Sequence, residues 1–176
     1  MAIDVAGAEE ADLPELADVA ARTFPLACPP SVTQENIAAF IDENLSQARL
    51  RDYLADSDRA VLAARDDGAM VGYVMLIRGV PDDDDVLKAV TPRPAVELSK
   101  LYVLPGSHGA GVSSALMTAA RQHAINLGAK CMWLGVNQQN RRAQRFYTKH
   151  GFTINGTKTF RLGAGVENDY VMVRPL

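Results

Sequence analysis

The sequence contains only two cysteines, Cys28 and Cys131, among 176 residues. Two cysteines are too few for the disulfide framework of a small secreted protein, and these two have no metal-ligand spacing. Basic residues are not in excess either, because 18 Lys and Arg stand against 21 Asp and Glu and give a formal net charge of −3. A nucleic-acid binder needs a basic surface that neutralises phosphates, so we expect no nucleic-acid partner and a reducing, cytoplasmic environment.

Long hydrophobic runs are absent as well. No stretch approaches the ~20 apolar residues that span a bilayer, and Met1 to Glu10 lacks the basic and apolar regions of a secretion signal. The histidines His108, His123 and His150 share no ligand spacing, so we expect no metal. A length of 176 residues with 48% hydrophobic residues is typical of one globular domain. We therefore expect a single domain over residues 1–176, a monomer or homodimer with no membrane partner.

Two kinds of periodicity predict a mixture of helices and strands. Apolar residues spaced by threes and fours predict helices over 12–23, around Ile37 to Leu45 with a cap at Ser31 or Thr33, and over 48–54, 112–127 and 140–150. Apolar runs with β-branched residues predict strands over 60–65, 70–78, 95–104, 131–136 and 171–173. Asp66-Asp67-Gly68 is typical of a hairpin turn, and Gly128 and Gly151 end their helices.

The segment from Gly79 to Pro94 differs in composition. It contains three prolines, one glycine and four consecutive aspartates, Asp82 to Asp85. This composition predicts a loop rather than a helix or strand.

The segment with the clearest chemical signal is a strand, a glycine-containing loop and a helix, from Glu97 to Leu127. Glycines let the backbone curl around a ligand, and the helix start presents unpaired N–H groups to an anion such as phosphate. The loop lacks the Gly-Lys-Ser/Thr ending of a Walker loop, and Gly109-Ala110-Gly111-Val112-Ser113-Ser114 lacks the third glycine of a dinucleotide fingerprint. Nucleotide hydrolysis and hydride transfer therefore lose support.

The predicted helix over 140–150 gives a more specific indication of the kind of phosphate-containing ligand. Asn140, Ala143, Tyr147 and the Gly151-Phe152 ending follow the loop in order, and together with Leu101-Tyr102-Val103 they resemble the acetyl-CoA-binding core of the GNAT superfamily of N-acetyltransferases. The resemblance implies an α+β fold with three layers, α/β/α, in which helices flank a mixed, largely antiparallel sheet. It also implies that acetyl-CoA is the acetyl donor, bound between two splayed strands near Leu101 and Val136.

The resemblance also implies the contacts of the donor. The pantetheine arm would pair with the backbone of Leu101, Tyr102 and Val103, while Asn140 and Tyr147 would contact CoA from the helix. The pyrophosphate would lie on the loop and helix start, which comprise His108, Gly109, Ala110, Gly111, Val112, Ser113 and Ser114. The family pattern of Arg or Gln, then Gly, then Gly or Ala falls here on His108, Gly111 and Ser113. His108, Ser113 and Ala110, where many members have lysine, depart from it, so we expect altered CoA affinity and phosphate binding through backbone N–H groups.

Two residues are candidates for proton transfer. Tyr147 lies seven residues after Asn140, on nearly the same helix face, and the resemblance places its hydroxyl near the thioester sulfur, where it would protonate the departing thiolate. The alternative is a tyrosine buried between helix and sheet. Glu97 would share a strand face with Ser99, Leu101 and Val103 if no bulge intervenes, and would accept the proton of the amine. A bulge would change that parity, and a surface salt bridge is the alternative for Glu97.

The acceptor is less well specified by the sequence. The segment from Glu97 to Pro105, with His108, resembles the polyamine-acetylating PaiA-like branch, and Asp82 to Asp85 would attract a cationic amine if that loop bordered the cleft. A solvated acidic loop is the alternative. We therefore expect direct acetyl transfer to a primary amine, of a polyamine or another small cationic amine, with a protein or peptide amine as a further acceptor. The competing hypothesis is a catalytically weak protein of the same fold that binds acyl-CoA as a sensor or scaffold.

Overall fold

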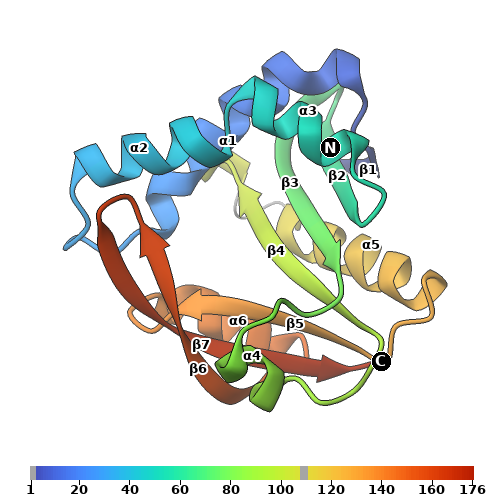
Figure 1. Cartoon of the computed structure of the whole chain (residues 1–176). Coiled ribbons are helices and arrows are strands. Elements are labelled where there is room, and N and C mark those ends of the chain that lie inside the picture. Colours follow the sequence, from blue (N-terminus) through green and yellow to red (C-terminus); the bar gives the residue numbers. More distant parts are fainter. Residues whose placement is uncertain (1–2, 108–110) are drawn as a thin grey trace.

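The computed structural model describes residues 3–107 and 111–176. Its strands form one seven-stranded sheet in the order β1-β2-β3-β4-β5-β7-β6 (Figure 1). Neighbouring strands are antiparallel except β4 and β5, which run parallel. The strands are β1 (Ile3–Gly7), β2 (Arg59–Asp66), β3 (Ala69–Arg78), β4 (Ala95–Val103), β5 (Cys131–Asn137), β6 (Thr153–Leu162) and β7 (Gly165–Pro175). The predicted mixed, largely antiparallel sheet is confirmed.

Helices cover both faces of this sheet. On one face, α1 (Leu13–Ala27), α2 (Gln34–Asn44) and α3 (Gln47–Ala55) bury a core that includes Leu16, Phe40 and Tyr73. On the other face, α5 (Val112–Asn126) and α6 (Arg141–Lys149) bury a second core that includes Leu116 and Tyr147. Figure 1 shows α5 on the opposite side of β3 and β4 from α1 to α3. The three-layer α/β/α arrangement is therefore also confirmed.

Caps and turns fix several boundaries that the sequence predicted. Thr33, rather than Ser31, caps α2 by accepting a hydrogen bond from the Asn36 N–H at 3.1 Å. The β2–β3 turn has positive φ at Asp67 (49°) and Gly68 (89°), as a tight hairpin turn requires. Because these local signals depend on only a few neighbouring residues, they could be predicted without knowledge of the tertiary structure.

The prediction of a loop from Gly79 to Pro94 was wrong in part. Asp84–Ala89 forms the short helix α4, which packs against β6 and β7. Asp83 caps this helix by accepting hydrogen bonds from the N–H groups of Asp85 and Val86, at 3.0 and 3.3 Å. Acidic side chains stabilise the positive end of a helix, so the aspartate run begins a helix here.

The two edge strands of the sheet were not predicted. β1 and β6 have mostly exposed or half-buried side chains, so neither has the apolar run that predicts a strand. β7 is also longer than the predicted strand 171–173, because its first part, Gly165 to Asp169, is mostly polar and lacks the apolar run that predicts a strand, although it pairs with β6.

Candidate active site

The central feature of the candidate site is the separation of β4 from β5. The parallel ladder joins only Ala95–Cys131, Val96–Met132 and Glu97–Trp133. β4 then continues to Val103 and β5 to Asn137 without further pairing between them, and Figure 1 shows the two strands diverging. The divergence opens the sheet at its centre.

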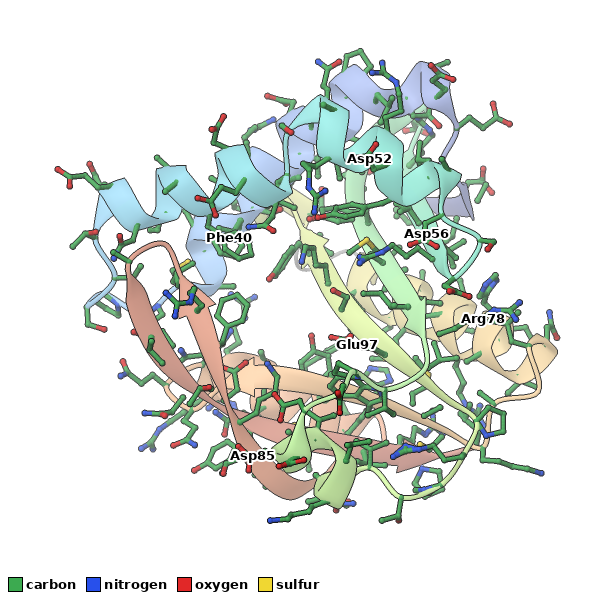
Figure 2. All side chains as sticks on the ribbon, in the orientation of Figure 1. Phe40, Asp52, Asp56, Arg78, Asp85 and Glu97 are labelled. Atoms are coloured by element: carbon green, nitrogen blue, oxygen red, sulfur yellow. The ribbon has the colours of Figure 1, made fainter. Side chains whose placement is uncertain are left out.

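A cavity of about 680 Å³ occupies this opening. Its lining comes from both faces of the sheet, which means that the cavity passes between β4 and β5 from the α5 and α6 side to the α1 and α2 side. Figure 2 labels Phe40 on α2 and Glu97 on β4, which both contribute to the lining. A passage of this kind can bring two substrates together from opposite sides of a sheet.

A bulge in β4 determines which side chains face each side of the passage. Met75 pairs with Lys100 and Leu76 with Leu98, so Ser99 is the extra residue. The bulge reverses the alternation, so the condition for a common face of Glu97, Ser99, Leu101 and Val103 is not met and the alternative parity holds. Leu98 instead continues the face of Leu101 and Val103 toward α5, whereas Glu97 shares its face with Lys100 and Tyr102, toward α1 and α2.

Most of the predicted site residues meet at this cavity. Its lining includes Glu97, Leu101, Tyr102, Val103, Gly111, Ser113, Ser114, Asn140 and Tyr147. Val112 is different, because its side chain is fully buried in the core beneath α5. His108, Gly109 and Ala110 lie outside the described residues, so their predicted contacts stay predictions.

The start of α5 has the features of an anion site. Gly111 precedes the helix with φ of 79°, a conformation that favours glycine, and has no side chain to cap the helix. The first turn of α5 has no acidic residue, and Ser113 and Ser114 line the cavity beside it. N–H groups at a helix start that face a cavity are suited to a phosphate group.

The start of α6 is held differently. Asn140 is the cap of α6 rather than its first residue, since its side-chain oxygen accepts a hydrogen bond from the Ala143 N–H at 3.1 Å. The Gln144 amide donates to the carbonyls of Asn137 and Gln138 at 3.1 and 3.0 Å, which ties the end of β5 to α6. Asn140 therefore lies at a fixed position in the cavity lining, and its side-chain amide nitrogen donates to no other residue of the described ranges.

Tyr147 lies at the boundary between core and cavity. Its ring packs edge-on against Phe146 and Phe152, and its side chain is only 9% exposed, so the alternative of a tyrosine between helix and sheet is correct for the ring. The residue nevertheless lines the cavity, and no other described residue hydrogen-bonds its hydroxyl. Burial raises the pKa of this phenol, so the hydroxyl keeps its proton at neutral pH.

Charged side chains line the part of the cavity that faces α1 and α2. Burial raises the pKa of Glu97 above that of an ordinary glutamate, although Lys100 and Lys158 oppose the shift. Burial lowers the pKa of Lys100 to about 8. Lys158 forms an ion pair with Asp169, whose carboxylate lies 3.5 Å from the ammonium nitrogen. Glycine at position 135 leaves room for this pair, since a side chain there would collide with Lys158.

Sequence reasoning missed Lys100, Lys158, Asp169 and Cys28 as lining residues. Lys158 and Asp169 are cross-strand partners in the β6–β7 hairpin, so recognition of its Gly163-Ala164-Gly165 turn would have paired them. Cys28 has a pKa raised to about 11 by burial, and its thiol donates weakly to the Phe24 carbonyl at 3.5 Å. It is therefore a protonated thiol, not a reactive thiolate.

The structure also bears on metal binding and on membrane spanning. Across residues 3–107 and 111–176, no group of three or more His, Cys, Asp or Glu side chains is placed to hold a metal ion. Within the same ranges, no helix has both the length and the apolar character needed to cross a membrane.

Comparisons with known proteins agree with the fold and the motifs. An uncharacterized N-acetyltransferase of Mycobacterium tuberculosis is 62% identical over 165 residues, which cover 94% of this chain and 98% of that protein. An uncharacterized N-acetyltransferase of Lactobacillus delbrueckii is 23% identical over 99% of this chain and 98% of its own length. The crystal structure of the PaiA N-acetyltransferase of Thermoplasma acidophilum in complex with coenzyme A has the same fold, with a TM-score of 0.79, 22% identity and full coverage of both chains.

The family assignment rests on a direct match to a family model. The model of the acetyltransferase (GNAT) family matches residues 16–152, which run from α1 to the end of α6 and include β2 to β5 and the start of α5. The family that the sequence motifs predicted is thereby confirmed, and the chain belongs to the GNAT family of acetyltransferases.

Proposed function

We propose that this chain transfers the acetyl group of acetyl-CoA directly to a primary amine. The observation that carries the proposal is the cavity that passes between β4 and β5, with a helix start on one side and ionisable side chains on the other. Such a passage lets donor and acceptor approach each other from opposite faces of the sheet, which is the arrangement that direct transfer needs.

The donor fits the α5 and α6 side of the passage. Phosphate groups would bind the N–H groups that follow Gly111, and the pantetheine arm would run along Leu101, Tyr102 and Val103 at the unpaired edge of β4. Asn140 would contact the donor from the α6 cap. The bound thioester would then lie near Tyr147, at the boundary between core and cavity.

The acceptor must lose a proton before it can attack. An ammonium has no free electron pair, and Glu97, with its raised pKa, is suited to take that proton directly or through water. The nitrogen then forms a bond to the acetyl carbon as the carbon–sulfur bond breaks. The departing thiolate takes the proton of the Tyr147 hydroxyl, and the second proton that the acetylated nitrogen loses as it becomes the amide restores that hydroxyl, directly or through water.

An acetyl-cysteine intermediate has little support. Cys28 lines the cavity, but its pKa of about 11 keeps it protonated, and Cys131 is fully buried. A thiol becomes an effective nucleophile only as the thiolate. Direct transfer needs neither residue.

The acceptor is a small amine that is cationic in solution, and a polyamine is one member of that class. Glu97, Glu167 and Asp169 line the cavity and would attract an ammonium group. The run from Asp82 to Asp85, which was expected to attract a cationic amine if its loop bordered the cleft, is not part of the described lining of this cavity. Preference for a cationic amine therefore depends on the three carboxylates inside the cavity.

A turnover screen tests the proposal. Release of free CoA thiol from acetyl-CoA is measured with polyamines, amino acids, aminoglycosides and peptides with free N-termini, and products are identified by mass spectrometry. We expect acceptor-dependent thiol release that matches formation of an N-acetyl product. Tight CoA binding with no acceptor in the whole screen would instead favour the acyl-CoA sensor or scaffold.

A further inference from the structure

Two lysines of the cavity lie over a pair of aromatic rings. Phe40 of α2 and Phe160 of β6 contact each other with ring centroids 5.5 Å apart. The ammonium nitrogen of Lys100 lies 5.8 Å from the Phe40 centroid, and that of Lys158 lies 5.4 Å from the Phe160 centroid. All four residues line the cavity, so this part of it combines apolar walls with two positive charges.

The two lysines differ in how their charge is balanced. Lys158 is paired with Asp169, and the two side chains are only 15% and 8% exposed. Lys100 has no carboxylate within ion-pairing distance in the described part of the chain; the negative charge of Glu97 favours its ammonium form from a longer distance, and Arg59 and Lys158 add positive charge nearby. Removing an ammonium group from water without a paired anion is unfavourable, and an anionic ligand would relieve that cost.

The position of Lys100 relative to Glu97 limits the kind of anion. The bulge at Ser99 places both side chains on the same face of β4, toward the same part of the cavity. If Glu97 receives the proton of the amine, a group bound by Lys100 lies close to that amine. A molecule with an amine and a carboxylate on one carbon meets this requirement.

We propose that Lys100 binds the carboxylate of the amine acceptor, so that the acceptor is a small α-amino acid with an apolar side chain. This inference rests on the proposed acetyl transfer and narrows its acceptor from amines in general to one whose ammonium group faces Glu97 and whose carboxylate faces Lys100, which excludes the polyamines that the cavity carboxylates alone would admit. Phe24, Phe40 and Phe160 provide the apolar wall for the acceptor side chain. A polyamine would instead bring a second ammonium group toward Lys100 and Lys158, where like charges repel.

Matched acceptors test the inference. Leucine, methionine and phenylalanine are each compared with the corresponding amide and with the amine that lacks the carboxyl group, and spermidine is included. A charge-assisted contact between an ammonium and a carboxylate strengthens binding by roughly 10- to 100-fold. The kcat/KM of each amino acid that is acetylated should therefore exceed that of its amide by at least about tenfold. A ratio near one, or a preference for spermidine, overturns the inference but leaves acetyl transfer intact.

Variants then assign the preference to Lys100. In Lys100→Gln the ratio of acid to amide should fall to about one, whereas Lys100→Arg should keep most of the preference because the charge remains. Lys130→Gln is the matched control, since Lys130 is exposed and lies outside the cavity lining. Retention of the full ratio in a folded Lys100→Gln variant contradicts the assignment.

A binding measurement separates this inference from the proposed function. If no amine is acetylated at all, acetyl transfer fails, and calorimetry of leucine, methionine and phenylalanine with the CoA-bound wild type and Lys100→Gln still decides the role of Lys100. Binding that is at least about tenfold weaker in the variant supports carboxylate recognition. Equal binding, or no binding to either protein, overturns it.

Discussion

Gly72 on β3 offers a direct test of how the sheet holds the end of β4. Gly72 pairs with Val103, and a side-chain carbon at position 72 would lie 2.8 Å from the Tyr102 carbonyl oxygen and 3.1 Å from a Val103 methyl carbon. The carbonyl belongs to the backbone and cannot rotate away. Gly72→Ala should therefore push the end of β4, where the pantetheine arm is proposed to bind, away from β3.

The magnitude follows from two opposing effects. Overpacking a buried site costs about 1–3 kcal/mol, and replacing glycine by alanine in a strand returns roughly 0.5–1 kcal/mol of conformational entropy. The net loss in the free energy of unfolding should be about 0–2.5 kcal/mol with a central value of about 1 kcal/mol, which lowers Tm by about 2–4 °C for a chain of this size. Because the displaced residues are Tyr102 and Val103, KM for acetyl-CoA should also rise severalfold.

Calorimetry and steady-state kinetics measure these effects, with Gly7→Ala as the matched control. Gly7 lies at the end of the edge strand β1, and a side-chain carbon there would meet no atom within 4 Å. The control should keep KM and should keep or slightly raise Tm, because it gains the same conformational entropy without a collision. If Gly72→Ala has the same Tm and the same KM for acetyl-CoA as the wild type, close contact between β3 and β4 does not position the donor.

Three further predictions test the proposed roles. Glu97→Gln should lower kcat/KM by about 100-fold and remove the rise in activity with pH. The reason is that the base acts only when deprotonated, and the pKa of Glu97 lies above the ordinary glutamate value. A wild-type pH profile in the variant would eliminate Glu97 as the base. Tyr147→Phe should slow the single-turnover rate by about 100-fold while changing CoA affinity little, and an unchanged rate would remove its hydroxyl from the mechanism. Asn140→Ala and its control Thr33→Ala each delete a helix cap and should each lower the free energy of unfolding by about 1 kcal/mol. Only Asn140 lines the cavity, so only Asn140→Ala should weaken CoA binding as measured by calorimetry. Equal CoA affinity in both variants would limit Asn140 to a capping role.

The sequence predicted the donor half of the site because that half depends on local motifs. Gly111 and Ser113 lie at the start of α5, and Asn140 and Tyr147 lie on α6, so spacing along the chain places each pair, and the resemblance to the family joined the two pairs in one site. The loop from His108 to Ala110 lies outside the described residues, and its departures from the family pattern stay predictions about CoA affinity.

The acceptor half could not be predicted in the same way because distant elements build it. Phe40 on α2, Lys100 on β4 and Lys158 on β6 meet only after the sheet has formed in its full strand order. The face of Glu97 also depended on the bulge at Ser99, which has no sequence signal of its own. β6 was not predicted from its polar sequence, so its lysine could not be placed.

Direct transfer of acetyl from acetyl-CoA to an amine is the central claim. Rapid-quench mass spectrometry of the wild-type protein, mixed with acetyl-CoA and with an acceptor identified by the screen, measures acetylated product and acetylated protein in the same samples. We predict N-acetylated acceptor that forms in step with free CoA, and no acetylated protein when the acceptor is omitted. Acetyl groups on Cys28 that form before the product and pass to it, or release of CoA without any acetylated amine, would contradict the claim.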